Sequence, residues 1–323
     1  MNWGFNGRFA RLLAAGLLVG LTAGTAWAEK IRIFAGSSPV FAPVFIADQQ
    51  GFFAKEGLDV TVRPFTSGAE ATEGFRSGAA EFLVASDVPL LYLLVGGDTA
   101  MLAQFSANPD MLLIVGPKGM SGPADLKGKK VGLVTKSASE YLLNNYLKRA
   151  GMSLSDVERV NLAPFDQVPA LVRGDVYALS SWKPFDTKIA QLGGGKHDVA
   201  SWNGKENYVL FSGIVAKRAF IAKNPDETQK VVRALANAAK WMADADAKTY
   251  SEALAKYLKT DARDVQAVIA NNKWDMAASP EFKSTMVDIE KFLIDQGLIK
   301  SSVNWDVAYD WSFLKKVDPK LVP

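Results

Sequence analysis

"KKVGLVTKSASEYLLNNYLKRAGMSLSDVERVNLA", residues 129–163, holds a strand, a helix and a second strand in this order. The apolar run at 129–134 indicates a buried strand, residues from about 138 to 150 indicate a helix, and residues 157–163 indicate another strand. Apolar runs that alternate with helices in this way are typical of parallel sheets with helices on both faces. The stretch therefore predicts an α/β fold.

The same alternation continues on both sides of this stretch. Further strands are predicted at residues 30–35, 58–65, 81–86, 99–105, 111–116 and 175–181. After residue 217 the pattern changes, because Asn224 is a helix N-cap candidate, Pro225 suits the first helical position and Glu227 the third. Apolar residues then follow at helical spacing: Val231, Val232, Leu235, Ala238, Ala239 and Met242. We expect a C-terminal tail of helices that covers sheets built earlier in the chain.

The two series of strands indicate two lobes. Residues 115–130 are dense in Gly, Pro and Lys, and a second passage between the lobes is expected near 212–217. We therefore predict one lobe from residues 29–115 and 216–323, and an inserted lobe from residues 116–215. Two α/β lobes joined by two crossings have a hinge and a cleft between them.

The first 28 residues have the pattern of a secretory signal peptide. Arg8 and Arg11 precede a short apolar run, and "AWA" at 26–28 is a small-residue cleavage site. The run is shorter than the roughly 20 residues that a bilayer span needs, which disfavours a membrane anchor. We expect cleavage after Ala28 and a soluble protein in the periplasm of a Gram-negative bacterium.

Charge and cysteine content exclude several classes of protein. The chain has 323 residues with a net charge of +3, and loss of the two leader arginines lowers this charge to +1. Such a balance gives no polycationic surface for nucleic acid. There is no Cys, so the fold must be stabilised by its cores rather than by disulfides. We expect a monomer.

Hydroxyl side chains stand where several strands end and helices begin. Ser67-x-x-Glu70 and Ser137-x-x-Glu140 both fit a capping box, so helix capping alone would explain them. In an open parallel sheet, however, all these helix starts lie at the carboxyl edge, where ligands bind. Each start offers N–H donors and about half a positive charge, which favours an anion.

Four stretches in order resemble a known family. They are "QQGFFAKEGLDV" (49–60), "LKGKKVGLVTKSASEYLLNNYLKRAGM" (126–152), "ALVRGDVYALSSWKPF" (170–185) and "FIAKNPDETQKVVRALANAAKWM" (220–242). The chain resembles the periplasmic solute-binding proteins of ATP-binding-cassette importers for nitrate, sulfonates and taurine, which are similar to proteins that bind a thiamine pyrimidine precursor. The resemblance implies a type II-like two-lobed fold, closure on a small-molecule ligand, and delivery to an inner-membrane permease with a cytoplasmic ATPase.

The resemblance also implies which loops line the cleft. Together with the strand-end hydroxyls and nearby aromatic residues it gives the candidate ligand-binding set. Its members are Ser37, Ser38, Phe41, Ser67, Ser86, Asp87, Lys136, Ser137, Ala138, Ser139, Glu140, Phe165, Trp182 and Lys183. Of the three aromatic residues Phe41, Phe165 and Trp202, we expect one to touch the ligand, and Trp182 offers a flat face for stacking or packing.

Two positions depart from the common family form, which is Gly-Asp-x-Asp-Ala followed by Trp-Glu-Pro. Tyr177 stands where the second Asp is usual, and Lys183 stands where Glu is usual. If Lys183 faces the cleft, the site favours an anion. If it faces solvent, the position tolerates either Lys or Glu and says nothing about the ligand. Glu140 in the cleft would suit an ammonium group and hence a zwitterion, but as a capping residue it carries no such meaning.

The sequence offers little for catalysis. His197 is the single histidine and lies in a turn, where a solvated surface role is the common case, and no G-x-S-x-G motif occurs. Zinc would need several nitrogen or sulfur ligands, which the chain lacks. We expect a binding protein with no catalytic residues, metal or cofactor. The alternatives are a protein for a heteroaromatic ligand, a periplasmic sensor, or an enzyme on the same fold.

Overall fold

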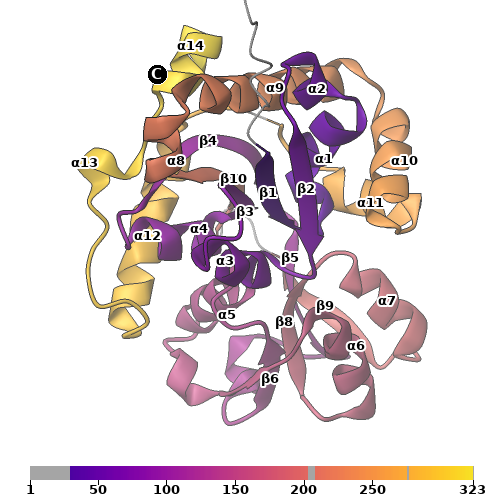
Figure 1. Ribbon diagram of the computed structural model, residues 1–323. Helices are drawn as coiled ribbons and strands as arrows, with labels where there is room; N and C mark the ends of the chain where they lie inside the picture. Colours follow the sequence, from indigo (N-terminus) through magenta and orange to yellow (C-terminus); the bar gives the residue numbers. More distant parts are fainter. Residues whose placement is uncertain (1–29, 203–207, 275, 323) are drawn as a thin grey trace, which may run out of the picture.

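Two five-stranded sheets, each flanked by helices, form the two lobes of the molecule (Figure 1). The structure is a computed structural model that describes residues 30–202, 208–274 and 276–322. The predicted two-lobed α/β fold is confirmed. The predicted signal peptide, residues 1–28, lies outside the described residues.

The first sheet has the strand order β2-β1-β3-β10-β4. β1 is parallel to β2 and β3, whereas β10 is antiparallel to β3 and β4, so the sheet is mixed. Its strands are β1 (Ile31–Gly36), β2 (Val60–Phe65), β3 (Phe82–Ser86), β4 (Thr99–Asn108) and β10 (Leu210–Lys217). The central strands β1 and β3 are buried, as an apolar run between two layers of helices requires.

The second sheet has the strand order β7-β6-β8-β5-β9. β6 is parallel to β7 and β8, and β5 is antiparallel to β8 and β9. Its strands are β5 (Leu112–Pro117), β6 (Lys130–Leu133), β7 (Glu158–Asn161), β8 (Ala178–Trp182) and β9 (His197–Trp202). Each sheet thus repeats one plan, in which the chain arrives from the other lobe in the antiparallel strand, β10 in the first sheet and β5 in the second.

Helices cover both sheets. In the first lobe the helices between strands are η1 (Pro39–Phe41), α1 (Ala42–Gln49), α2 (Phe52–Lys55), α3 (Gly68–Arg76) and α4 (Asp87–Leu94). The second lobe has η2 (Pro123–Leu126), α5 (Ala138–Lys148), η3 (Leu154–Asp156), α6 (Pro164–Arg173) and α7 (Phe185–Leu192).

The C-terminal tail packs onto the first lobe, as Figure 1 shows in orange and yellow. It contains α8 (Arg218–Lys223), α9 (Pro225–Asp244), α10 (Ala247–Leu258), α11 (Ala262–Ile269), α12 (Pro280–Asp295), α13 (Trp305–Ala308), α14 (Ser312–Val317) and η4 (Pro319–Leu321). The six predicted apolar positions of α9 are all buried, and the helix packs against α1, α2 and α14. Asn224 holds the N-cap position, but its side chain makes no capping hydrogen bond.

The two crossings lie earlier in the chain than the predicted boundaries at 115/116 and 215/216. β5 pairs with the second sheet, so the first crossing is residues 109–111, and β10 pairs with the first sheet, so the second lies between residues 202 and 210. The sheet to which an apolar strand belongs is decided by its pairing partners. Its sequence pattern is the same in either sheet, so the sequence alone does not place the crossing. The Gly- and Pro-rich stretch instead forms the turns that follow β5.

None of the described helices is long and apolar enough to cross a membrane.

Candidate functional site

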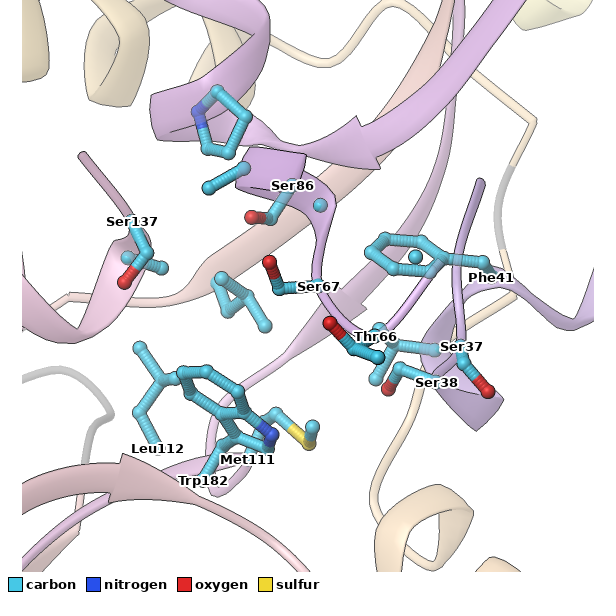
Figure 2. A pocket seen from close by; sticks show the side chains of 17 residues that line it. Ser37, Ser38, Phe41, Thr66, Ser67, Ser86, Met111, Leu112, Ser137 and Trp182 are labelled. Atoms are coloured by element: carbon cyan, nitrogen blue, oxygen red, sulfur yellow. The ribbon is translucent and has the colours of Figure 1, made fainter. Parts of the chain in front are cut away.

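A pocket of about 70 Å³ lies between the lobes, at the carboxyl ends of the parallel strands (Figure 2). The first lobe contributes the segments that follow β1, β2 and β3, and the second lobe contributes the ends of β6 and β8. The lining residues are Gly36, Ser37, Ser38, Val40, Phe41, Thr66, Ser67, Gly68, Ala69, Ser86, Pro89, Met111, Leu112, Ser137, Ala138, Trp182 and Leu210. None of these side chains is charged.

Three helices begin at this pocket with a serine as N-cap. The Oγ of Ser67 accepts a hydrogen bond from the Glu70 N–H at 3.1 Å, and that of Ser137 accepts one from the Ser139 N–H at 3.2 Å. Ser86 caps α4 without a side-chain hydrogen bond to the helix. The first N–H groups of a helix have no acceptor within it, and its start carries partial positive charge. Figure 2 shows the hydroxyls of Ser67 and Ser86 directed into the same space.

The loop after β1 brings the first strand close to this space. A Cβ on Gly36 would lie 2.8 Å from Cε2 of Phe41 and 2.9 Å from the backbone N of Gly68, so only glycine permits this approach. In the same loop, the Oγ of Ser38 is buried and has no hydrogen-bond partner among the described residues. A buried hydroxyl without a partner is costly unless another group satisfies it. Ser38 thus offers a free hydrogen bond at the pocket.

The opposite wall is apolar. The indole of Trp182 lines the pocket and packs against Phe185, with ring centroids 6.0 Å apart. Figure 2 shows Met111 and Leu112 beside this indole, Leu210 is a further apolar lining residue, and the sequence reasoning missed all three. They stand beside the two crossings, so a correct placement of the crossings would have pointed to them.

Glu140 is a structural residue rather than a cleft carboxylate. Its side chain is 2% exposed, with one oxygen 2.7 Å from Nη1 of Arg159 and the other accepting the Lys136 N–H at 2.9 Å. The capping alternative is therefore the correct one. In a standard capping box Glu140 would accept the N–H of the N-cap Ser137, whereas here it accepts the N–H of Lys136, one residue earlier. The carboxylate that Glu140 would offer to the ammonium group of a zwitterion is thus already paired with Arg159.

Asp87 and Ser139 are fully buried behind the pocket and do not line it. The Asp87 carboxylate accepts the N–H of Val88 at 2.8 Å and that of Phe211 at 3.0 Å, which ties the start of α4 to β10. Burial raises the pKa of Asp87 to about 7, against the opposing effect of these two hydrogen bonds. Ser139 hydrogen-bonds to Ser137.

Neither Lys183 nor Tyr177, the two departures from the family form, is among the residues that line the pocket, but Lys183 lines an adjoining hollow that shares Ser37, Ser38, Thr66 and Trp182 with it. The Nζ of Lys183 is 2.9 Å from Oδ2 of Asp110, so this cation has a partner inside the protein. Tyr177 precedes β8 and lies at its opposite end from Trp182. The two substitutions therefore add no charge to the lining of the pocket itself, while the cation of Lys183 lies at the adjoining hollow between the lobes.

Other predicted residues line neighbouring hollows. Lys136 contacts a hollow that shares Thr66 and Ser67 with the pocket, and Phe165, with 68% of its surface exposed, contacts another that shares Trp182. The Trp202 side chain lies outside the described part of the chain. His197 lies at the start of β9 and is partly buried rather than fully solvated.

Of the fourteen predicted residues, the pocket is lined by Ser37, Ser38, Phe41, Ser67, Ser86, Ser137, Ala138 and Trp182. Within the described residues, no group of three or more His, Cys, Asp or Glu side chains is placed to hold a metal ion.

Comparison with known proteins gives a consistent picture. The sequence model of the family described as NMT1/THI5 like matches residues 38–248. A protein of Brucella abortus (strain 2308) named as a binding protein is 27% identical over 229 residues, which are 71% of each chain. The taurine-binding periplasmic protein of Escherichia coli (strain K12) is 28% identical over 219 residues, 66% of this chain and 65% of that protein.

Solved structures share the fold. The alkanesulfonate-binding protein SsuA from Xanthomonas axonopodis pv. citri, bound to MOPS, matches with a TM-score of 0.72 and 20% identity over 85% of this chain and 95% of that one. The desulfurization enzyme DSZB, in complex with biphenyl-2-sulfinic acid, matches with a TM-score of 0.69 and 18% identity over 90% and 99%. The fold alone therefore does not separate a binding protein from an enzyme.

Proposed function

The chain belongs to the NMT1/THI5-like family, and we propose that it is a periplasmic solute-binding protein that captures a small organic monoanion between its lobes. In this proposal the signal peptide is removed after Ala28, the monomer closes on its ligand, and an ATP-binding-cassette permease receives it. The observation that carries the proposal is the meeting of three serine-capped helix starts with an aromatic wall in one interlobe pocket.

The lining selects for charge and for an apolar body. Helix starts are each worth about 1 kcal/mol to an anion, so three of them supply roughly 3 kcal/mol, which alone gives a Kd weaker than millimolar. Burial of about 100–150 Å² of apolar ligand surface adds roughly 3 kcal/mol. The sum, about 6 kcal/mol, corresponds to a Kd of some tens of micromolar. A sulfonate or carboxylate with an apolar body therefore fits better than nitrate.

A zwitterion such as taurine fits less well. No described residue that lines the pocket carries a carboxylate to hold an ammonium group. The same lining contains no His, Lys, Asp or Glu that would act as a general base, which favours binding over catalysis.

A thermal-shift screen tests the proposal, with alkyl and aryl sulfonates, taurine, aromatic carboxylates, nitrate and pyrimidines as probes. A ligand at 100 times its Kd adds about 2.7 kcal/mol to the free energy of unfolding. We expect the largest shifts from aryl sulfonates or carboxylates. No shift from any anion would contradict the proposal, and a shift confined to the pyrimidines would favour the heteroaromatic alternative.

Transport is tested separately. Deletion of this protein should abolish uptake of the identified ligand by the source bacterium. Normal uptake together with a lost response to the ligand would instead favour a sensor. The N-terminal residue of the protein from the periplasmic fraction tests cleavage after Ala28.

A further inference from the structure

We propose that Lys183 is a positioning residue, which holds Trp182 and the two lobes in their binding geometry through a clamp formed with Asp110 and Asn271. This inference rests on the proposed function. Lys183 lines the hollow that adjoins the pocket but not the pocket itself, and in this proposal it acts through its neighbours.

The clamp is a compact set of polar contacts. The Nζ of Lys183 lies 2.9 Å from Oδ2 of Asp110 and 3.2 Å from the carbonyl oxygen of Ala267. The Nδ2 of Asn271 donates to the same Asp110 oxygen at 2.7 Å. The Lys183 side chain is 11% exposed and that of Asp110 26% exposed. Contacts this well shielded from water are stronger than those of an exposed surface pair.

These residues come from three separate parts of the molecule. Lys183 follows β8 of the second lobe, Asp110 lies in the first crossing, and Ala267 lies in α11 of the first-lobe tail. The clamp therefore joins both lobes to the segment that connects them.

Lys183 and Asp110 are each one residue away from a residue that lines the pocket. Trp182 precedes Lys183, and Met111 follows Asp110, and both line the pocket. The backbone N–H of Lys183 donates to the Met111 carbonyl at 2.9 Å, and Trp182 is paired with Leu112 in the sheet. Movement of Lys183 relative to Asp110 would therefore shift the indole relative to Met111 and Leu112, its neighbours in the apolar wall.

The charges at the clamp are matched. Ala267 belongs to the last turn of α11, where the carbonyl groups carry partial negative charge and a cation is favoured. A glutamate at position 183, as in the common family form, would face both Asp110 and this helix end and be repelled by both. Lysine at this position is thus suited to its local partners.

A double-mutant cycle with Lys183→Met and Asp110→Asn tests the clamp. Lys118→Met is the control, because Lys118 is exposed on the turn after β5 and its replacement changes the net charge equally. Calorimetric titration with benzenesulfonate, well below the melting temperature of each variant, measures affinity. We expect each single variant to bind about tenfold more weakly, which is about 1.4 kcal/mol, and the double variant to bind no worse than the weaker single one.

The ligand-free protein gives a second readout. Because the chain contains no Cys, spin labels at Ala54→Cys and Ala190→Cys, both exposed, report the distance between the lobes. We expect Lys183→Met to broaden this distance distribution and Lys118→Met to leave it unchanged. A purely structural role would lower the melting temperature without changing the affinity or the distances.

The outcomes separate the two proposals. Affinity within twofold of the wild type in Lys183→Met, or additive losses in the double variant, would overturn the clamp while the proposed function stands. If the wild type binds no probe, the proposed function fails, and the distance distribution alone decides on the clamp: an unchanged distribution in Lys183→Met would overturn it.

Discussion

Replacement of Ser86 by Asp places a negative charge in the pocket at little cost to the fold. Ser86 is the N-cap of α4, with an extended backbone and no side-chain hydrogen bond to the helix. Asp and Ser are comparable N-caps, so α4 should form equally well in the variant. Asn is a comparable N-cap of nearly the same shape, and Ser86→Asn therefore serves as the uncharged control.

The expected loss of affinity follows from the position of Ser86 on the pocket wall. A bound sulfonate would lie at roughly 5 Å from the new carboxylate, and two unit charges at this separation repel by about 3 kcal/mol at an effective dielectric constant of about 20. Binding of benzenesulfonate should therefore weaken by about two hundredfold relative to Ser86→Asn. Titration calorimetry measures both. Equal affinities in the two variants would refute the placement of an anion beside Ser86.

Three further changes test other parts of the structure. Trp182→Leu keeps the wall apolar but removes the indole, and should weaken benzenesulfonate binding by about 1 kcal/mol, roughly fivefold; an unchanged Kd would exclude the stacking role. Asp87 holds a proton in the folded protein up to a pKa of about 7, whereas the unfolded chain releases it near 3.8. The free energy of unfolding measured with urea should therefore fall as pH rises between these values, by at most about 1.4 kcal/mol per pH unit. Asp87→Asn should remove this fall, and the same slope in the variant would show that Asp87 is not its source. Arg159→Met leaves Glu140 buried without its cation and should lower the free energy of unfolding by about 1–2 kcal/mol, with no change in benzenesulfonate affinity; a loss of affinity at equal stability would place Glu140 in the site after all.

The sequence predicted the fold well because the fold depends on local patterns. The strand–helix–strand order of residues 129–163 and the apolar stripe of α9 each follow from periodicity within one segment. The hydroxyls at helix starts are also local signals, and this explains why Ser67, Ser86 and Ser137 were found. Periodicity does not show which sheet β5 joins and which sheet β10 joins, because an apolar strand of this kind fits either sheet.

The contacts of Lys183 could not be predicted for the same reason. Lys183 finds its partners 73 and 84 residues away along the chain, at Asp110 and Ala267, and no spacing in the sequence reveals either contact. The distance of Tyr177 from the pocket, in contrast, follows from the sequence. Strand residues rise about 3.3 Å each, so five residues before Trp182 place it roughly 16 Å from that end of the strand.

The most direct test of the central claim compares benzenesulfonate with benzenesulfonamide, its uncharged analogue of nearly the same shape, in calorimetric titrations of the wild-type protein. Both ligands fit the apolar wall, but only the sulfonate carries the charge that the helix starts favour. We predict one sulfonate bound per chain, with a Kd of some tens of micromolar and an affinity at least tenfold above that of the sulfonamide. Equal affinities, or tighter binding of the sulfonamide, would contradict an anion site at this pocket.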